Sequence, residues 1–121
     1  MEMVIGVTSA EHWTREGLAV AALKDRFIYP MYGVWAPTRQ RYLDLLNAYL
    51  RELKQPEKIR TVADLGSGTG VLSVMVGESG VRGQIVCIDN SARAVECSRL
   101  NAQIFGVEVL PRKLDLVAAY L

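Results

Sequence analysis

Two acidic residues and three glycines in the middle of the chain have the types and spacing of a small-ligand site. Asp64 ends a short apolar stretch, and Gly66, Gly68 and Gly70 follow it, alternating with small residues. Glycines permit a tight turn and a close approach of ligand to backbone, and the start of a following helix offers unpaired N–H groups. Asp89 comes 19 residues after Gly70 and ends a second apolar stretch, where a carboxylate can accept both hydroxyls of a ribose. These residues predict one nucleotide-binding crevice.

The spacing of the glycines argues against a dinucleotide. A dinucleotide fingerprint requires G-x-G-x-x-G, but counting from Gly66 its third glycine would stand at Val71, and the chain has Gly70 instead. A carboxylate at Asp64, directly ahead of the glycines, also suits a cationic ligand better than a diphosphate. An amino acid that carries an ammonium or sulfonium group is such a ligand.

Alternating strands and helices are predicted around this crevice. We expect strands at 61–65, 84–89 and 107–110, and helices at 38–54, from 71 to Gly77 or Gly80, and from about 91 to 104. Such alternation requires right-handed crossovers and a parallel sheet, with the three strands side by side in the order 3-2-1. Asp115, just after the third strand, then lies at the same edge of the sheet as the glycines and Asp89.

The helix at 38–54 is expected to begin at Thr38, a good N-cap residue. One apolar face is predicted for it, made of Tyr42, Leu45, Leu46, Tyr49, Leu50 and Leu53. An earlier helix is expected to begin near Ser9, since Trp13, Val20, Leu23 and Phe27 have approximately helical spacing, although Gly17 can break it.

The segment from 27 to 38 is predicted to be non-helical, because three of its residues are Pro30, Gly33 and Pro37. It is dense in aromatic residues, namely Phe27, Tyr29, Tyr32 and Trp35. It is either a loop held to the core by its rings or a lid over a ligand pocket.

Composition limits the remaining possibilities. With 121 residues, the chain is at most one domain. Its net charge of +1 gives no overall electrostatic field that would attract nucleic acid or an anionic membrane. Cys87 and Cys97 are expected to be free thiols in a reducing compartment. No signal sequence or membrane-spanning run is present, so a cytoplasmic location is expected. His12 is the only histidine, and no metal site is predicted.

The run from Asp64 to Gly70 resembles the first motif of the class I S-adenosylmethionine-dependent methyltransferases, an apolar strand followed by D/E-x-G-x-G-x-G. The resemblance implies that Gly66 to Gly70 lie along the methionyl and ribose parts of S-adenosylmethionine. It also implies that Asp89 holds the ribose hydroxyls and that Asp115 faces the adenine amino group. The cofactor-binding set that it implies is Asp64, Gly66, Ser67, Gly68, Thr69, Gly70, Asp89, Asn90, Asp115 and Leu116.

The stretch 99–102 looks like the branch that contains protein-glutamine N-methyltransferases and small-domain RNA methyltransferases. The resemblance implies an α/β fold, a Rossmann-like three-layer sandwich that is truncated here. Residues 1–37 would form an N-terminal helix and aromatic cap, and 38–121 a partial S-adenosylmethionine-binding domain.

The branch carries an Asn/Asp-Pro-Pro-Tyr/Phe motif after its fourth strand, and this chain has none, so no catalytic residue is assigned. We expect a longer enzyme or association into an oligomer to complete the sheet.

The implied function is methyl transfer from S-adenosylmethionine, to a nitrogen of a protein, an RNA or a small molecule. Two alternatives stay open. One is a cofactor-binding or interaction module without activity, and the other is a nicotinamide-dependent oxidoreductase, which the glycine spacing disfavours.

Overall fold

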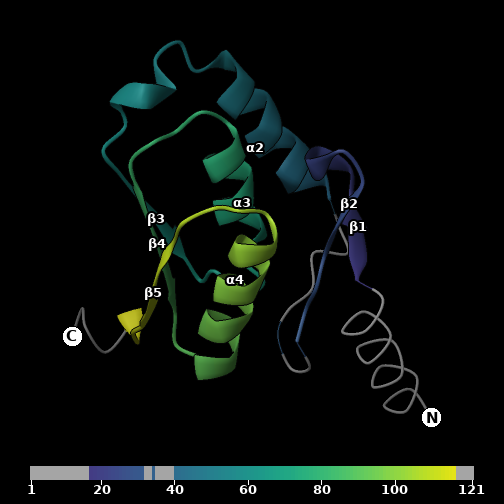
Figure 1. Ribbon diagram of the computed structural model, residues 1–121, viewed down its shortest axis with the longest axis vertical. Helices are drawn as coiled ribbons and strands as arrows, with labels where there is room; N and C mark the ends of the chain where they lie inside the picture. Colours follow the sequence, from purple (N-terminus) through teal and green to yellow (C-terminus); the bar gives the residue numbers. More distant parts are fainter. Residues whose placement is uncertain (1–16, 32–33, 35–39, 117–121) are drawn as a thin grey trace.

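The computed structural model describes residues 17–31, 34 and 40–116, which form a hairpin followed by strands and helices in alternation (Figure 1). In chain order the elements are β1 (Leu18–Val20), the 3₁₀ turn η1 (Ala21–Leu23), β2 (Arg26–Ile28), α2 (Arg41–Glu52), the 3₁₀ turn η2 (Pro56–Lys58), β3 (Thr61–Leu65), α3 (Val71–Glu78), β4 (Gln84–Asp89), α4 (Ala92–Ile104) and β5 (Leu110–Lys113). None of the helices in these ranges is long and apolar enough to cross a bilayer.

The main sheet is parallel, with β4 between β3 and β5. Asp64 pairs with Cys87 across the first interface, and Val86 pairs with Leu110 across the second. Both crossover helices, α3 and α4, lie on one side of this sheet (Figure 1). The predicted parallel sheet with flanking helices is therefore confirmed. The strand at 84–89 and the helix from 92 to 104, which Ser91 caps by accepting the Ala94 N–H at 3.3 Å, are also confirmed.

The opposite face of the sheet is bare in the part of the chain that the structure describes. Ala63 and Leu65 are exposed on this face, Leu65 to 60%, and they pair with Val86 and Ile88 of β4. No described helix lies over this face of the sheet (Figure 1). Two of the three expected layers are therefore present in the described ranges.

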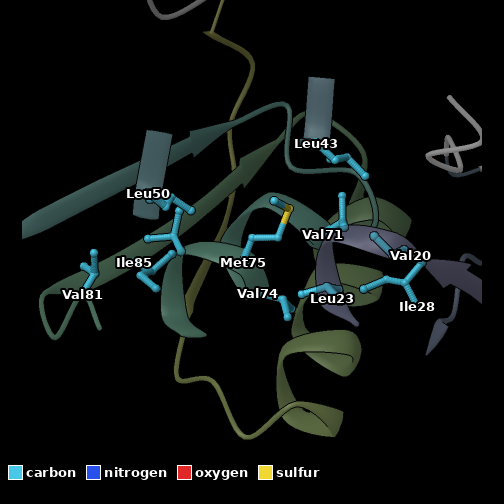
Figure 2. Packing of buried hydrophobic residues seen from close by; sticks show 11 residues of the cluster. Val20, Leu23, Ile28, Leu43, Leu50, Val71, Val74, Met75, Val81 and Ile85 are labelled. Atoms are coloured by element: carbon cyan, nitrogen blue, oxygen red, sulfur yellow. The ribbon is translucent and has the colours of Figure 1, made fainter. Parts of the chain in front are cut away.

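The hydrophobic core lies between the hairpin, α2, α3 and β4 (Figure 2). Val20 and Ile28 of the hairpin are fully buried with Val74 of α3, and Leu43 and Leu50 come from α2. Burying a side chain of this size contributes about 1.5–3 kcal/mol relative to leaving it in water. The hairpin is thus part of the same core as the sheet.

A β-hairpin occupies residues 18–28, where the sequence predicted the second half of a helix. Its connecting turn contains Lys24 and Asp25, with φ of 58° and 59°. Two consecutive left-handed residues cannot belong to a right-handed helix, so this part of the helix prediction is wrong. Phe27, which we expected on the buried face, is 49% exposed, whereas Ile28 is fully buried. The expected helix start near Ser9 and Trp13 lies outside the described residues.

Gln40 ties the hairpin to the start of α2. Its side-chain Oε1 accepts the Ala21 N–H at 2.8 Å, and its Nε2 donates to the Ala19 carbonyl at 3.0 Å. Gln40 is also the residue that precedes the first turn of α2, without a side-chain cap of its own. The helix therefore begins after the expected N-cap at Thr38, which lies outside the described ranges.

The buried stripe of α2 differs from the prediction. Leu43 and Leu50 are buried, and Leu46 and Leu53 pack partly against the core. Three residues of the predicted face are exposed instead, and they are Tyr42, Leu45 and Tyr49. The helix carries apolar residues on two adjacent stripes, and it packs against η1 and α3 with the stripe of Leu43 and Leu50 buried. Helical spacing alone could not choose between the stripes.

The third strand lies at 110–113, three residues later than predicted, and includes Pro111. Pro111 stands opposite Cys87 in the register, although proline has no N–H to donate. A proline is tolerated at this place because β5 is an edge strand among the described residues, and alternate N–H groups of an edge strand point away from the sheet.

A buried polar cluster lies beneath the start of α3. Ser73 donates its hydroxyl hydrogen to Asp64 Oδ2 at 2.6 Å, and its Oγ lies 3.0 Å from Cys87 Sγ. Burial raises the pKa of the Asp64 carboxyl, the hydrogen bonds from Ser73 oppose the rise, and the charge of Asp89 adds to it. Burial also raises the pKa of the Cys87 thiol. Both cysteines are free, as predicted.

The raised pKa of Asp64 predicts how stability depends on pH. A carboxyl with a higher pKa in the folded state than in the unfolded state stabilises the fold below the unfolded pKa of about 3.9, and this contribution is lost as the pH rises through the folded value. Asp64→Asn cannot ionise, so its stability relative to wild type should improve as the pH rises from about 4 to about 7. Each unit of difference between the two pKa values corresponds to about 1.4 kcal/mol. Urea denaturation at several pH values measures the free energy of unfolding of both proteins.

Ser73→Ala is the matched variant, and its stability relative to wild type should change with pH in the opposite direction. It removes a hydrogen bond that favours the ionised carboxylate, so its stability should fall more steeply with rising pH than that of wild type. If the stability of wild type and of both variants changed with pH in the same way, the carboxyl of Asp64 would not be buried against Ser73 as the structure has it.

Gly77 of α3 allows a close contact with the chain that follows α4. A Cβ built on Gly77 would lie 2.4 Å from Val107 Cγ1, and the branched valine side chain has little rotamer freedom. Overpacking of this kind costs about 1–3 kcal/mol, against about 1 kcal/mol that alanine gains over glycine within a helix. We expect Gly77→Ala to lower the free energy of unfolding.

A double-mutant cycle tests this contact. Val107→Ala makes room for the added methyl group, so the double variant should be more stable than the sum of the two single changes predicts. Additivity in urea denaturation would show that the two residues are not in contact.

Candidate functional site

The glycine turn connects β3 to α3 and is fixed by backbone hydrogen bonds to β4. The N–H groups of Gly66 and Ser67 both donate to the Ile88 carbonyl, at 2.8 and 3.0 Å. Gly66, Gly68 and Gly70 all have positive φ, of 71°, 54° and 82°, which other residues adopt only with strain. The turn therefore requires glycines at the positions that the sequence singled out.

Asp89 lies against this turn. Its Oδ2 accepts the Gly68 N–H at 3.0 Å, and its Oδ1 accepts the Ser91 N–H at 3.0 Å. The ends of β3 and β4 thus meet as the sequence analysis predicted, with the glycines and the acid in one place. A carboxylate has about four acceptor sites, so each oxygen of Asp89 retains acceptor capacity beyond its backbone bond.

The side chains of Asp64, Ser67 and Thr69 point into the protein. All three are buried, and Ser67 Oγ lies within hydrogen-bond distance of Ser98 Oγ, at 2.9 Å. Asp64, which we expected to face a cationic ligand, is bonded to Ser73 beneath the turn. Direct contact with a ligand at the surface of the turn therefore falls to backbone groups, and the charge of Asp64 acts from below.

The remaining predicted residues lie at the same edge of the sheet. Asn90 follows β4 and is exposed. The Leu114 N–H donates to the Asp89 carbonyl at 3.0 Å, which places exposed Asp115 one residue beyond this link. Leu116 is half-buried at the end of the described residues. The structure thus brings the ends of all three strands together at this edge.

Two residues of α4 that the sequence analysis did not assign to the site contact the glycine turn. Ser98 Oγ also donates to the Gly68 carbonyl at 2.9 Å, and Asn101 Nδ2 donates to the Thr69 carbonyl at 3.0 Å. Both are buried on the helix face that carries Ala94, Cys97 and Ala102. In the sequence, Ser98 and Asn101 stand three residues apart on a helix face that otherwise carries small apolar residues. This pattern was the only sequence feature that could have indicated their role at the turn.

Two observations bear on whether an adenosyl cofactor fits here. A Cβ built on Gly66 would meet nothing within 4 Å, so there is open space beside the exposed part of the turn. Thr69 Oγ1 is buried and has no hydrogen-bond partner within the described structure, which is unusual for a hydroxyl. The open space at Gly66 fits a turn that receives a ligand, whereas the Thr69 hydroxyl faces the interior. Among the described residues no cluster of His, Cys, Asp and Glu could hold a metal ion.

Comparisons with known proteins identify the family and the fold of the chain. The family model for the methyltransferase small domain matches residues 41–120. Ribosomal RNA large subunit methyltransferase G of Vibrio atlanticus is 42% identical over 52 residues, which are 43% of this chain and 14% of that protein. Ribosomal protein L11 methyltransferase of Thermotoga petrophila is 33% identical over 82 residues, which are 68% of this chain and 28% of that protein.

A solved structure shares the fold. The crystal structure of ribosomal protein L11 methylase from Lactobacillus delbrueckii subsp. bulgaricus aligns with a TM-score of 0.59 over 78% of this chain and 47% of that chain, at 23% identity. At this identity the likeness shows the fold alone. The chain spans less than half the length of each of these relatives. The family match covers the α2 to β5 region that builds the glycine turn, and on this basis the chain belongs to the methyltransferase small domain family.

Proposed function

We propose that this chain supplies the S-adenosylmethionine-binding part of a methyltransferase that acts on a nitrogen of RNA or protein. The observation that carries the proposal is the hydrogen bond from the Gly68 N–H to Asp89 Oδ2 at 3.0 Å. It joins the glycine turn to an acid that can accept ribose hydroxyls, beside the open space at Gly66. Relatives named for ribosomal RNA and ribosomal protein L11 support RNA or protein as the acceptor class.

In this proposal each part of the site binds a different part of the cofactor. Asp89 accepts the two ribose hydroxyls, the backbone of Gly66 to Gly70 lies along the ribose and methionyl groups, and Asp115 faces the adenine amino group. Asn90 and Leu116 complete the same edge of the sheet. S-adenosylmethionine supplies a methyl group bound to a positively charged sulfur, which a nucleophile can take up in line with the leaving sulfur.

Charge favours this ligand over a nicotinamide dinucleotide. Asp64 and Asp89 place two carboxyl groups under and beside the turn. A diphosphate at the same place would be repelled, whereas a sulfonium or ammonium group is attracted. The sequence G-x-G-x-G, with Val71 where a dinucleotide fingerprint has its last glycine, agrees with the charges.

Calorimetric titration with S-adenosylmethionine and S-adenosylhomocysteine tests the proposal. Wild type should bind both at a single saturable site, and Asp89→Ala should weaken binding by at least about tenfold, because a hydrogen bond to a charged group contributes about 1.5–3 kcal/mol. Asp44→Ala is the matched control, since Asp44 is an exposed acid of α2 and its loss should leave the affinity unchanged.

Two results would count against the proposal. Folded wild type that prefers NAD would restore the oxidoreductase alternative, and folded wild type that binds neither ligand would show that this chain does not hold the cofactor. Circular dichroism of each variant establishes that it is folded before the titration.

A further inference from the structure

The side chain of Asn101 on α4 forms hydrogen bonds with two other segments of the chain. It is 1% exposed. Its Oδ1 accepts the Tyr29 N–H at 2.8 Å, and its Nδ2 donates to the Tyr29 carbonyl at 2.9 Å and to the Thr69 carbonyl at 3.0 Å. Tyr29 directly follows β2, and Thr69 belongs to the glycine turn. One carboxamide therefore joins the exit of the hairpin to the candidate site.

The pattern of donors and acceptors fixes the orientation of this carboxamide. An N–H group faces Oδ1, while three carbonyl oxygens face Nδ2, since Cys97 O also lies within 3.1 Å. A carboxamide has two N–H donors and one carbonyl oxygen, and only this orientation satisfies the Tyr29 N–H. Neither a carboxylate nor an apolar side chain of similar size reproduces the set of contacts.

Ser98, one turn earlier on α4, holds the other half of the glycine turn. It donates its one hydroxyl hydrogen to the Gly68 carbonyl at 2.9 Å, and Ser67 Oγ lies 2.9 Å from the same Ser98 oxygen. Neither of these contacts involves the hairpin, so Ser98 fixes the turn to α4 alone. Asn101 adds the segment after β2, whose Tyr29 carbonyl also accepts from Cys97 Sγ at 3.4 Å.

We infer that Asn101 is a positioning residue, which holds residues 29–31 against the glycine turn so that this segment forms one wall of the cofactor site. The inference rests on the proposed function. The segment after β2 runs alongside α4 (Figure 1), and Pro30 within it is buried. Asn101 makes no contact with the cofactor in this account. It acts through the peptide groups of Tyr29 and Thr69.

Affinity for S-adenosylhomocysteine in Asn101→Ala tests the inference. We expect affinity to fall by about tenfold, because the hydrogen bonds to both segments are lost together. Ala102→Gly is the matched control. It is buried on the same helix and destabilises α4 through the backbone freedom of glycine, but it breaks no bond to Tyr29 or Thr69. Its affinity should stay within twofold of wild type.

A pH profile separates positioning from a general loss of stability. In Asn101→Asp an ionised carboxylate would face carbonyl oxygens, but a protonated carboxyl can donate to one of them. Burial raises the pKa of such a carboxyl above its usual value of about 3.9. Affinity relative to wild type at the same pH should therefore recover between about pH 8 and pH 5. The comparison with wild type corrects for the titratable groups nearby, Cys97 on α4 and Asp64 and Asp89 at the turn.

Hydrogen exchange judges the inference independently of the cofactor. Without ligand, Asn101→Ala should speed exchange of the Tyr29 amide at least about fivefold more than Ala102→Gly does. If wild type fails to bind the cofactor, the proposed function falls and this exchange decides the role of Asn101. Equal exchange and equal affinity in the two variants would overturn the inference. Asn101→Ser is the milder variant if Asn101→Ala does not fold.

Discussion

The absence of a side chain at Gly70 lets α4 lie directly against the glycine turn, and the candidate site depends on this contact. A Cβ at Gly70 would lie 2.8 Å from Ser98 Cα, a backbone atom that cannot rotate away. With α4 at this distance, Ser98 reaches the Gly68 carbonyl from one side, and the Ile88 carbonyl holds the Gly66 and Ser67 amides from the other. A turn without regular structure is thereby held in one conformation.

The repeating part of the fold could be predicted because its signals are local. The strand from Gln84 to Asp89 contains the apolar run from Ile85 to Ile88. Helix α4 begins at Ala92, directly after its N-cap Ser91, and is followed by Gly106 at φ +69°. The hairpin could not be predicted, because Val20, Leu23 and Phe27 happen to have helical spacing. Its left-handed turn at Lys24 and Asp25 contains neither glycine nor asparagine, the residues that most often indicate such a turn in a sequence. The buried stripe of α2 depends on packing partners distant in sequence.

The candidate site was predictable where it follows from strand geometry. The carboxyl ends of neighbouring parallel strands meet at one edge of a sheet, so the encounter of the glycines with Asp89 could be expected. The burial of Asp64 depends on which face of β3 the helices cover, and the same alternation exposes Leu65. The contacts of Ser73, Ser98 and Asn101 depend on the rotation of two helices, which periodicity defines only coarsely.

The two acids of the site differ in what they do to the start of α3. The first turn of a helix carries unpaired N–H groups and a partial positive charge, and it usually attracts anions such as phosphate. Here the carboxyl of Asp64 lies beneath that first turn, bonded to Ser73, and its negative charge offsets the field of the helix. The protein thus supplies the anion itself, and a phosphate gains little at the turn. A ligand that offers hydroxyl groups to Asp89 and a positive charge to Asp64 gains from both acids at once.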